Sequence, residues 1–253
     1  MDDSKQRDPK AILNRLLDMG EDEVLLNIGE ESVVKVLIYP PTTETDTVES
    51  DIRLENALAA NSIDELVTVI ESGGGCDRCN LASGRNKIVV GAGDPDARIV
   101  FIGEGPGANE DKTGIPFVGR AGQLLDKIFA AMGLSREKGI YICNIVKCRP
   151  PGNRDPLPDE SEACIPYLKK QLELINPAAI CCLGRVAAQN LLETDAALGK
   201  LRGKIHFFEG VPVVVTYHPA YLLRNAAGKK PTWEDMKLLM KTAGMDIPDN
   251  GNR

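Results

Sequence analysis

Long apolar runs are missing from this sequence. No stretch reaches the roughly 18 consecutive apolar residues of a membrane-spanning helix, so we expect no membrane span. Residues 1–5 also lack the basic and then apolar pattern of a secretion signal, and we therefore expect a cytoplasmic protein. Hydrophobic residues make up 43% of the 253 residues, which is enough for one large domain with a sizeable buried core.

Positive charge is also scarce in the chain as a whole, which has a net charge of −7. Residues 1–75 contain 6 Lys and Arg against 17 Asp and Glu, whereas residues 76–253 contain 24 against 20. The acidic excess therefore belongs to the N-terminal part. Because phosphate binding needs local positive charge rather than a basic total, the remainder is compatible with DNA binding and equally with an ordinary solvated surface.

The N-terminal part differs from the rest in its pattern. Residues 5–19 have the apolar spacing of a short helix, and residues 40–47 form a polar, proline-led stretch that is typical of a linker. Residues 52–71 predict one helix or two, with Ser62 as the N-cap of the second. We therefore divide the chain into an acidic extension with its linker, residues 1–61, and a compact domain, residues 62–253.

After residue 95, apolar runs rich in β-branched residues alternate with helical patterns. The runs are continuously apolar, which is typical of strands buried on both faces of a parallel sheet. We predict an α/β fold, a three-layer α/β/α sandwich with a four-stranded, mostly parallel central sheet. The expected strands are 97–102, 140–146, 178–183 and 211–217, and the expected helices are 120–132, 159–175, 184–193 and 232–243.

Glycine, proline and polar residues follow each of the four expected strands. In open parallel sheets, ligands bind outside the carboxyl ends of the strands, so these segments should meet at one edge and form the ligand site. They are residues 103–107, Asn144 with residues 147–151, residues 184–185 and residues 218–219.

Seven cysteines in a chain without a secretion signal argue against a disulfide framework. Cys76 and Cys79 form a C-x2-C pair in a polar turn, and Cys148 and Cys164 supply a second pair with fifteen residues between them. An all-cysteine site without a nearby histidine suits zinc or a [4Fe–4S] cluster, and the residues alone leave both open. The other three cysteines lie in expected strands and predict core packing: Cys143, Cys181 and Cys182.

Several side chains near the predicted edge have both a functional and a structural interpretation. The glycine-rich residues 103–107 do not form G-x-G-x-x-G and no Walker lysine follows, which disfavours a nucleotide hydrolase. Phe117 is either a stacking platform for a base or a core residue. The amide of Asn144 matches the O4 and N3–H edge of uracil but could also cap a turn. Of the 2 histidines, His218 ends a strand, and His206 within a β-strand predicts a structural role.

Basic residues collect beside these segments. They predict either contacts to phosphate groups or ordinary solvated helix ends. They are Arg120, Lys147, Arg149, Arg154, Arg185 and Arg224.

In order and spacing, these motifs together resemble the family-4 uracil-DNA glycosylases over roughly residues 65–245. The resemblance rests on residues 103–107, the Phe117 loop, residues 144–151, residues 218–220 and the cysteine spacing. It implies a base-excision repair enzyme that hydrolyses the N-glycosidic bond of uracil in single- or double-stranded DNA and leaves an abasic site. It also implies a structural [4Fe–4S] cluster, whose ligands would be Cys76, Cys79, Cys148 and Cys164.

The resemblance further implies the roles of individual residues. Phe117 would stack on the uracil, Asn144 would read its edge, and His218 would face its O2. Glu104, Gly105 and Glu110 would line the pocket, with Glu104 the first candidate to orient the attacking water. We expect Leu222 or Leu223 to wedge into the DNA, and the remaining expected DNA contacts are Arg149 and Arg224.

Alternative functions remain. A relative that binds or cross-links uracil-containing DNA without turnover would have a basic, histidine-containing insertion after the first motif, and residues 111–117 run without one. A non-enzymatic iron–sulfur DNA-binding module would leave the convergence of Glu104, Asn144 and His218 unexplained. We expect a monomer, with the extension available to a repair or replication partner.

Overall fold

The computed structural model describes residues 23–27, 33–37, 44–72 and 75–248. The chain divides into two units, Met1–Glu49 and Ser50–Arg253. In the first unit, β1 (Glu23–Asn27) pairs with β2 (Val33–Leu37) in an antiparallel hairpin. The helix predicted at residues 5–19 lies outside the described residues. Within the described part of the chain, no helix is both long and apolar enough to cross a membrane.

A mixed, six-stranded sheet forms the centre of the second unit, in the order β3-β5-β4-β6-β8-β7. The four predicted strands are its parallel centre: β4 (Ile99–Gly103), β5 (Ile140–Asn144), β6 (Ala179–Leu183) and β8 (Val211–Thr216). The predicted α/β class is confirmed, but the sheet has six strands rather than four.

The two additional strands are antiparallel and lie at the edges of the sheet. β3 (Ala92–Gly93) has only 2 residues, too few for a sequence pattern. β7 (Ile205–Phe208) alternates exposed and half-buried residues, because its side chains point to opposite faces of the sheet and only one face is partly covered there. His206 lies in this strand, as expected.

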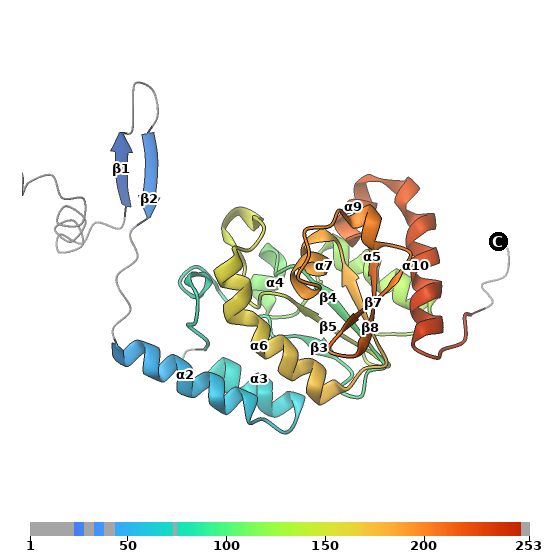
Figure 1. The fold of residues 1–253 in the computed structure, drawn as a ribbon, viewed down its shortest axis with the longest axis horizontal. Coiled ribbons are helices and arrows are strands. Elements are labelled where there is room, and N and C mark those ends of the chain that lie inside the picture. The colour runs from blue at the N-terminus through green and yellow to red at the C-terminus, as the bar shows by residue number, and fades with distance from the viewer. Residues whose placement is uncertain (1–22, 28–32, 38–43, 73–74, 249–253) are drawn as a thin grey trace, which may run out of the picture. The chain divides into compact units, whose positions relative to one another are not determined.

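Helices cover both faces of the sheet and complete the three predicted layers (Figure 1). On β4, Val100 and Ile102 face one buried cluster while Ile99 and Phe101 face the other, as the alternation along a strand requires. The first cluster is covered by α3 (Ile63–Glu71), α6 (Pro158–Ile175) and α7 (Arg185–Leu191), and the second by α5 (Arg120–Ala131) and α10 (Lys229–Thr242).

The predicted pair of helices before the glycine break is present, with α2 at Glu44–Leu58. The Ser62 hydroxyl accepts a hydrogen bond from the Glu65 N–H at 3.2 Å and so begins α3. Residues 44–47, which we expected to be linker, are the first turn of α2, so the linker prediction is wrong there. Ala57 and Ala60 are buried with Leu66, so residues 50–60 pack with the second unit, ahead of the boundary expected at residue 62.

Short helical segments follow the sheet strands and shape the predicted ligand edge. After β4 comes α4 (Ala108–Thr113), and after β8 comes α9 (Pro219–Arg224). The other short elements are η3 (Asn80–Ala82), η4 (Pro151–Asn153), α8 (Leu198–Leu201) and η5 (Ala226–Gly228).

Candidate active site

A cavity of about 500 Å³ opens at the carboxyl ends of the parallel strands. Segments that follow β4, β5 and β8 all contribute to its wall, as we expected for a ligand site at the carboxyl ends of parallel strands. Eight of the residues named individually in the sequence analysis line it: Glu104, Gly105, Glu110, Phe117, Asn144, Arg154, His218 and Arg224.

Asn144 ends β5 and is one of the residues that line this cavity. The residue is 1% exposed, and its Oδ1 is buried without a hydrogen-bond partner among the described residues. Its backbone carbonyl accepts a hydrogen bond from Lys147 Nζ at 2.7 Å. A buried polar atom without a partner costs about 1–3 kcal/mol, so an unpaired oxygen in a cavity wall marks a place where a ligand donor fits.

His218 is the N-cap of α9, and this position determines which ring nitrogen carries the proton. Its Nδ1 accepts a hydrogen bond from the Ala220 N–H at 3.1 Å, so the ring proton of the neutral form lies on Nε2. Burial, together with the charge of Arg224, lowers the pKa of His218 to about 4, and the charge of Glu110 partly opposes this shift. His218 is therefore a neutral imidazole near pH 7, with Nε2–H as its donor.

The Phe117 ring lies beside His218, with 5.6 Å between the ring centroids. The Phe117 backbone has φ = 55°, a left-handed conformation that costs a phenylalanine energy and must be held by its surroundings. Arg136 supplies part of this support, because its guanidinium donates to the carbonyls of Pro116 at 2.8 Å and Phe117 at 2.5 Å. Gly122 is required as well, since a Cβ there would lie 1.6 Å from the Phe117 oxygen.

Glu110 lines the cavity and stabilises the same loop through hydrogen bonds. Its Oε1 accepts hydrogen bonds from the N–H groups of Val118 at 2.9 Å and Gly119 at 3.0 Å. Part of the Glu110 carboxylate is thus committed to the backbone beside Phe117. The neighbouring carboxylate of Asp111, which is buried, accepts from the Asn86 N–H at 2.8 Å and so anchors a different loop.

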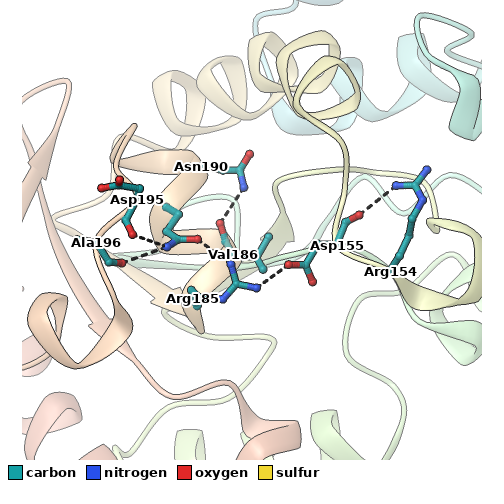
Figure 2. A network of polar contacts seen from close by, with 8 residues as sticks. Arg154, Asp155, Arg185, Val186, Asn190, Asp195 and Ala196 are labelled. Atoms are coloured by element: carbon teal, nitrogen blue, oxygen red, sulfur yellow. Dashed lines mark hydrogen bonds and ion pairs between the residues drawn. The ribbon is translucent and has the colours of Figure 1, made fainter.

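Glu104 follows β4 directly and is half-buried at the cavity wall. Burial, together with the charge of Asp155, raises the pKa of Glu104 to about 7, and the charge of Arg185 partly opposes this shift. Figure 2 shows why these charges are fixed: Arg185 reaches across to Asp155, with 2.5 Å between Nη2 and Oδ2. The Nη1 of Arg185 donates to Gln189 Oε1 at 2.8 Å within α7. The ion pair of Arg185 with Asp155 therefore connects the cavity loop with α7.

The six basic residues do not share one role. Lys147 is 2% exposed and donates inward, so the expectation that it faces phosphate is wrong. Arg154 forms a 2.6 Å ion pair with the buried Glu160, and Arg185 pairs with Asp155. The Arg149 Nε donates to Asn153 at 2.8 Å beside the cavity. Arg120 and Arg224 are exposed.

The two leucines expected to wedge into DNA differ in exposure. Leu222 is 2% exposed and lies on the buried face of α9, whereas Leu223 is 43% exposed. A wedge has to reach solvent before DNA arrives, so the structure restricts this role to Leu223.

The four cysteines of the two predicted pairs line one small space beside α6, on the side of the sheet opposite α5. Cys76 and Cys79 are half-buried, and Cys148 and Cys164 are buried. Apolar residues supply most of the remaining wall: Ile70, Leu81, Ile88, Val146 and Ala163. The other three cysteines are buried within β5 and β6, as expected.

Hydrogen-bond donors point at three of these four sulfurs. The Tyr167 hydroxyl donates to Cys76 at 3.3 Å, the Lys147 N–H to Cys164 at 3.3 Å, and Arg85 to Cys148 at 3.7 Å. Burial raises the pKa of the Cys164 thiol to about 12, and the charge of Lys147 opposes that shift. Donors around a buried sulfur stabilise the thiolate, which is the form that binds metal.

Some residues that support the cavity could not be identified from the sequence. Asp155 lines it and follows the predicted basic cluster, but a single aspartate after a proline turn carries no distinctive pattern. Arg136 and Gln171 act on residues far away in the chain, at separations of 19 and 24 residues. No local periodicity could have revealed those contacts.

This chain is similar to known DNA repair proteins. The profile of the Uracil DNA glycosylase superfamily matches residues 90–237. A type-4 uracil-DNA glycosylase of Thermotoga maritima is 49% identical over 156 residues, 61% of this chain and 81% of that enzyme. One from Archaeoglobus fulgidus is 42% identical over 195 residues, 74% and 96% of the two chains. A type-5 uracil-DNA glycosylase of Pyrobaculum aerophilum is 33% identical over 172 residues, 61% and 74% of the two chains. The range matched by the profile contains every residue that lines the cavity.

Proposed function

The chain belongs to the uracil-DNA glycosylase superfamily and, within it, to the type-4 enzymes, and from this premise we propose that it hydrolyses the N-glycosidic bond of uracil in DNA in the cavity of Asn144 and His218. It is a DNA repair glycosylase that leaves an abasic site. The observation that carries the assignment of the site is the unpaired Oδ1 of Asn144 in the cavity wall.

Asn144 reads the uracil edge. Its Oδ1 accepts from N3–H and its amide group donates to O4, which is the complementary pattern for uracil. Cytosine presents an acceptor at N3 and a donor at N4. The Oδ1 of Asn144 would then face an acceptor, and its NH2 group would face a donor. Phe117 stacks on the base and Gly105 lets the backbone approach it, while Glu110 holds the Phe117 loop in place.

His218 stabilises the leaving group. Cleavage of the bond develops negative charge on uracil, and a fixed donor aimed at O2 favours the transition state over the ground state. The hydrogen bond from Ala220 to Nδ1 keeps the proton on Nε2, where a donor is needed. No proton transfer is required, because the neutral imidazole already carries the donor.

Glu104 orients the attacking water. A carboxylate at the cavity wall accepts a hydrogen bond from water and favours the positive charge that develops on the sugar. With a pKa of about 7, Glu104 gains this charged form as the pH rises through neutrality.

Release of uracil from a duplex containing a single U·G pair tests the activity. We expect free uracil and alkali-labile abasic product from this duplex, and no product from matched duplexes with cytosine or thymine at that position. Equal cleavage of the cytosine duplex would contradict the role of Asn144, and no release from any duplex would contradict the enzyme assignment.

We further propose that Cys76, Cys79, Cys148 and Cys164 hold a [4Fe–4S] cluster. The donor set fits, since four sulfurs from two distant segments line one apolar space and three of them receive hydrogen bonds. Within the described ranges, no group of three or more His, Cys, Asp or Glu side chains is arranged around a single metal ion. When bound, the cluster cross-links the segments that carry its ligands.

Replacing Cys164 with serine should abolish cluster binding, because a hydroxyl is a poor substitute for a thiolate ligand. We expect the visible absorbance to be lost and iron to fall from about four atoms per chain to near zero. Cys181→Ser is the matched control, since Cys181 is equally buried but lies in β6. Full iron content in Cys164→Ser, or its loss in both variants, would contradict the ligand assignment.

DNA binds across the mouth of the cavity. Arg224 lines the cavity and is exposed, and Arg149 lies half-buried beside it, so we assign both to the DNA backbone. Leu223, on the exposed side of α9, fills the gap that the extruded uracil leaves in the base stack.

Replacing Leu223 with alanine should slow uracil release from duplex DNA by about tenfold, because unstacking a paired base costs a few kcal/mol. Release from single strands should change little. Ile205→Ala serves as the control, since Ile205 is 44% exposed against 43% for Leu223 but lies on β7. An equal loss on both substrates would exclude the wedge.

Several expectations concern the chain as a whole. We propose that residues 50–253 carry the glycosylase activity, that the protein acts as a monomer in the cytoplasm, and that the acidic extension contacts a repair or replication partner. Cross-linking without turnover is the competing function, and the count of uracils released per chain distinguishes the two.

A further inference from the structure

Lys147 is a buried cation in an unusual environment. It is 2% exposed, and its Nζ donates to two neutral oxygens at 2.7 Å, the Asn144 carbonyl and Gln171 Oε1. Among the described residues, no carboxylate forms an ion pair with it. An ammonium group is almost never buried without a compensating anion, so this position calls for nearby negative charge.

The cysteine site lies beside Lys147 and can supply this charge, because Lys147 and the four cysteines line the same small space. The Lys147 N–H donates to Cys164 Sγ at 3.3 Å, and Cys148 is the next residue in the chain. Four thiolates around a [4Fe–4S] centre leave a net negative charge there. The ammonium of Lys147 therefore lies between an anionic site and the residue that reads uracil.

Gln171, one of the two acceptors of the Lys147 ammonium group, is itself held in place by hydrogen bonds. Gln171 is 0% exposed, and its amide nitrogen donates to the Val90 carbonyl at 2.9 Å and the Tyr141 hydroxyl at 3.3 Å. Its oxygen is thereby left to accept from Lys147. Cys164 and Gln171 are seven residues apart on α6, which is two helical turns, so both lie on the same face of the helix. Lys147 thus bridges one face of α6 and the end of β5.

We propose that Lys147 is a positioning residue that couples the cysteine site to uracil recognition, because it bonds to Cys164 through its main chain and to Asn144 through its ammonium group. The ammonium of Lys147 holds the carbonyl of a residue that lines the cavity and whose side-chain oxygen is buried without a partner among the described residues. This inference rests on the proposed function of the site and deepens it.

Lys147→Met tests the coupling in the iron-loaded protein through two readouts. Loss of the charge-assisted hydrogen bond to Asn144 should raise the inhibition constant of free uracil about tenfold. Loss of a positive charge beside the cluster should shift its reduction potential to a more negative value, because the reduced state carries more negative charge. Lys170→Met is the matched control, since Lys170 is likewise a buried lysine but lies on α6, pairs with Glu173 at 2.9 Å and should leave both values unchanged when replaced.

The two readouts also show how the inference fails. A wild-type uracil inhibition constant in Lys147→Met would overturn the coupling to Asn144, and a wild-type potential would overturn the coupling to the cluster. Where Lys147→Met does not accumulate as folded, iron-containing protein, Lys147→Arg replaces it. That variant keeps the charge, so its potential should stay near the wild-type value while its uracil inhibition constant rises, and an unchanged inhibition constant would overturn the inference. If the wild-type protein releases no uracil, the proposed function itself has failed.

Discussion

His218→Ala releases uracil about a hundred- to a thousandfold more slowly than the wild-type protein and still binds DNA. This is the expected effect of removing one preorganised donor from a developing anion. The loss should appear in the single-turnover rate constant, measured with saturating enzyme on a single-uracil duplex. Binding to the same duplex, measured by fluorescence anisotropy, should change little, because the ring faces the base and not the DNA backbone.

The control for this variant is His206→Ala, the change of the second of the 2 histidines. The Nε2 of His206 lies 2.8 Å from the Leu201 carbonyl oxygen on the β7 side of the molecule, so its removal should leave the rate unchanged. Near-wild-type activity in His218→Ala would exclude the ring as the anion stabiliser. Equal losses in both variants would indicate a general effect on folding.

The pH dependence of the wild-type rate separates His218 from Glu104. The folded pKa of His218 is lowered to about 4, so the neutral, active form is fully present at pH 7 and is lost only as the pH falls toward 4. The pKa of Glu104 is raised to about 7, so its carboxylate form increases as the pH rises through that value. We expect the rate to rise through about pH 7, and Glu104→Gln should remove this dependence.

Asn144→Ala is the second variant with a large expected effect, a loss of about a hundredfold or more in kcat/KM for uracil release. The alanine removes both the acceptor for N3–H and the donor for O4, so the transition state loses two hydrogen bonds in a water-poor cavity. The inhibition constant of free uracil should rise in parallel, because the same contacts hold the product. Both quantities are measured on the same iron-loaded preparation.

Asn190→Ala is the matched control for Asn144→Ala. The amide of Asn190 donates to the Val186 carbonyl at 2.9 Å within α7, away from the cavity (Figure 2). It should release uracil at the wild-type rate. A small effect of Asn144→Ala with intact discrimination against cytosine would show that another group reads the base.

The parallel centre of the fold and the location of the site were predictable because each depends on local pattern. Buried parallel strands are continuously apolar, and polar residues at or just past their ends are recognisable, as Asn144 at the end of β5 and His218 two residues past β8 illustrate. The edge strand β3 was not predictable, because 2 residues carry no period. The start of α2 at Glu44 was hidden by threonines, which favour caps and turns over helix interiors.

The directions of side chains at the site were harder to predict than its location. The place of Lys147 beside a proline turn suggested a contact to phosphate. In the structure, Lys147 lies three residues after the end of β5, and its side chain points toward Gln171 and the core. Leu222 and Leu223 are adjacent, and only the rotation of α9 decides which of them is buried. The strained backbone of Phe117 depends on Arg136 and Gly122, and such a conformation follows from tertiary contacts alone.

The most direct test of the central claim is the number of uracils released per chain from an excess of single-uracil duplex. The products are followed as free uracil by chromatography and as protein–DNA adduct on a denaturing gel. We predict many uracils per iron-loaded chain, an abasic product and no adduct. Release that stops at one uracil per chain with a stable adduct, or DNA binding without any release, would contradict the assignment of this cavity as a hydrolytic uracil site.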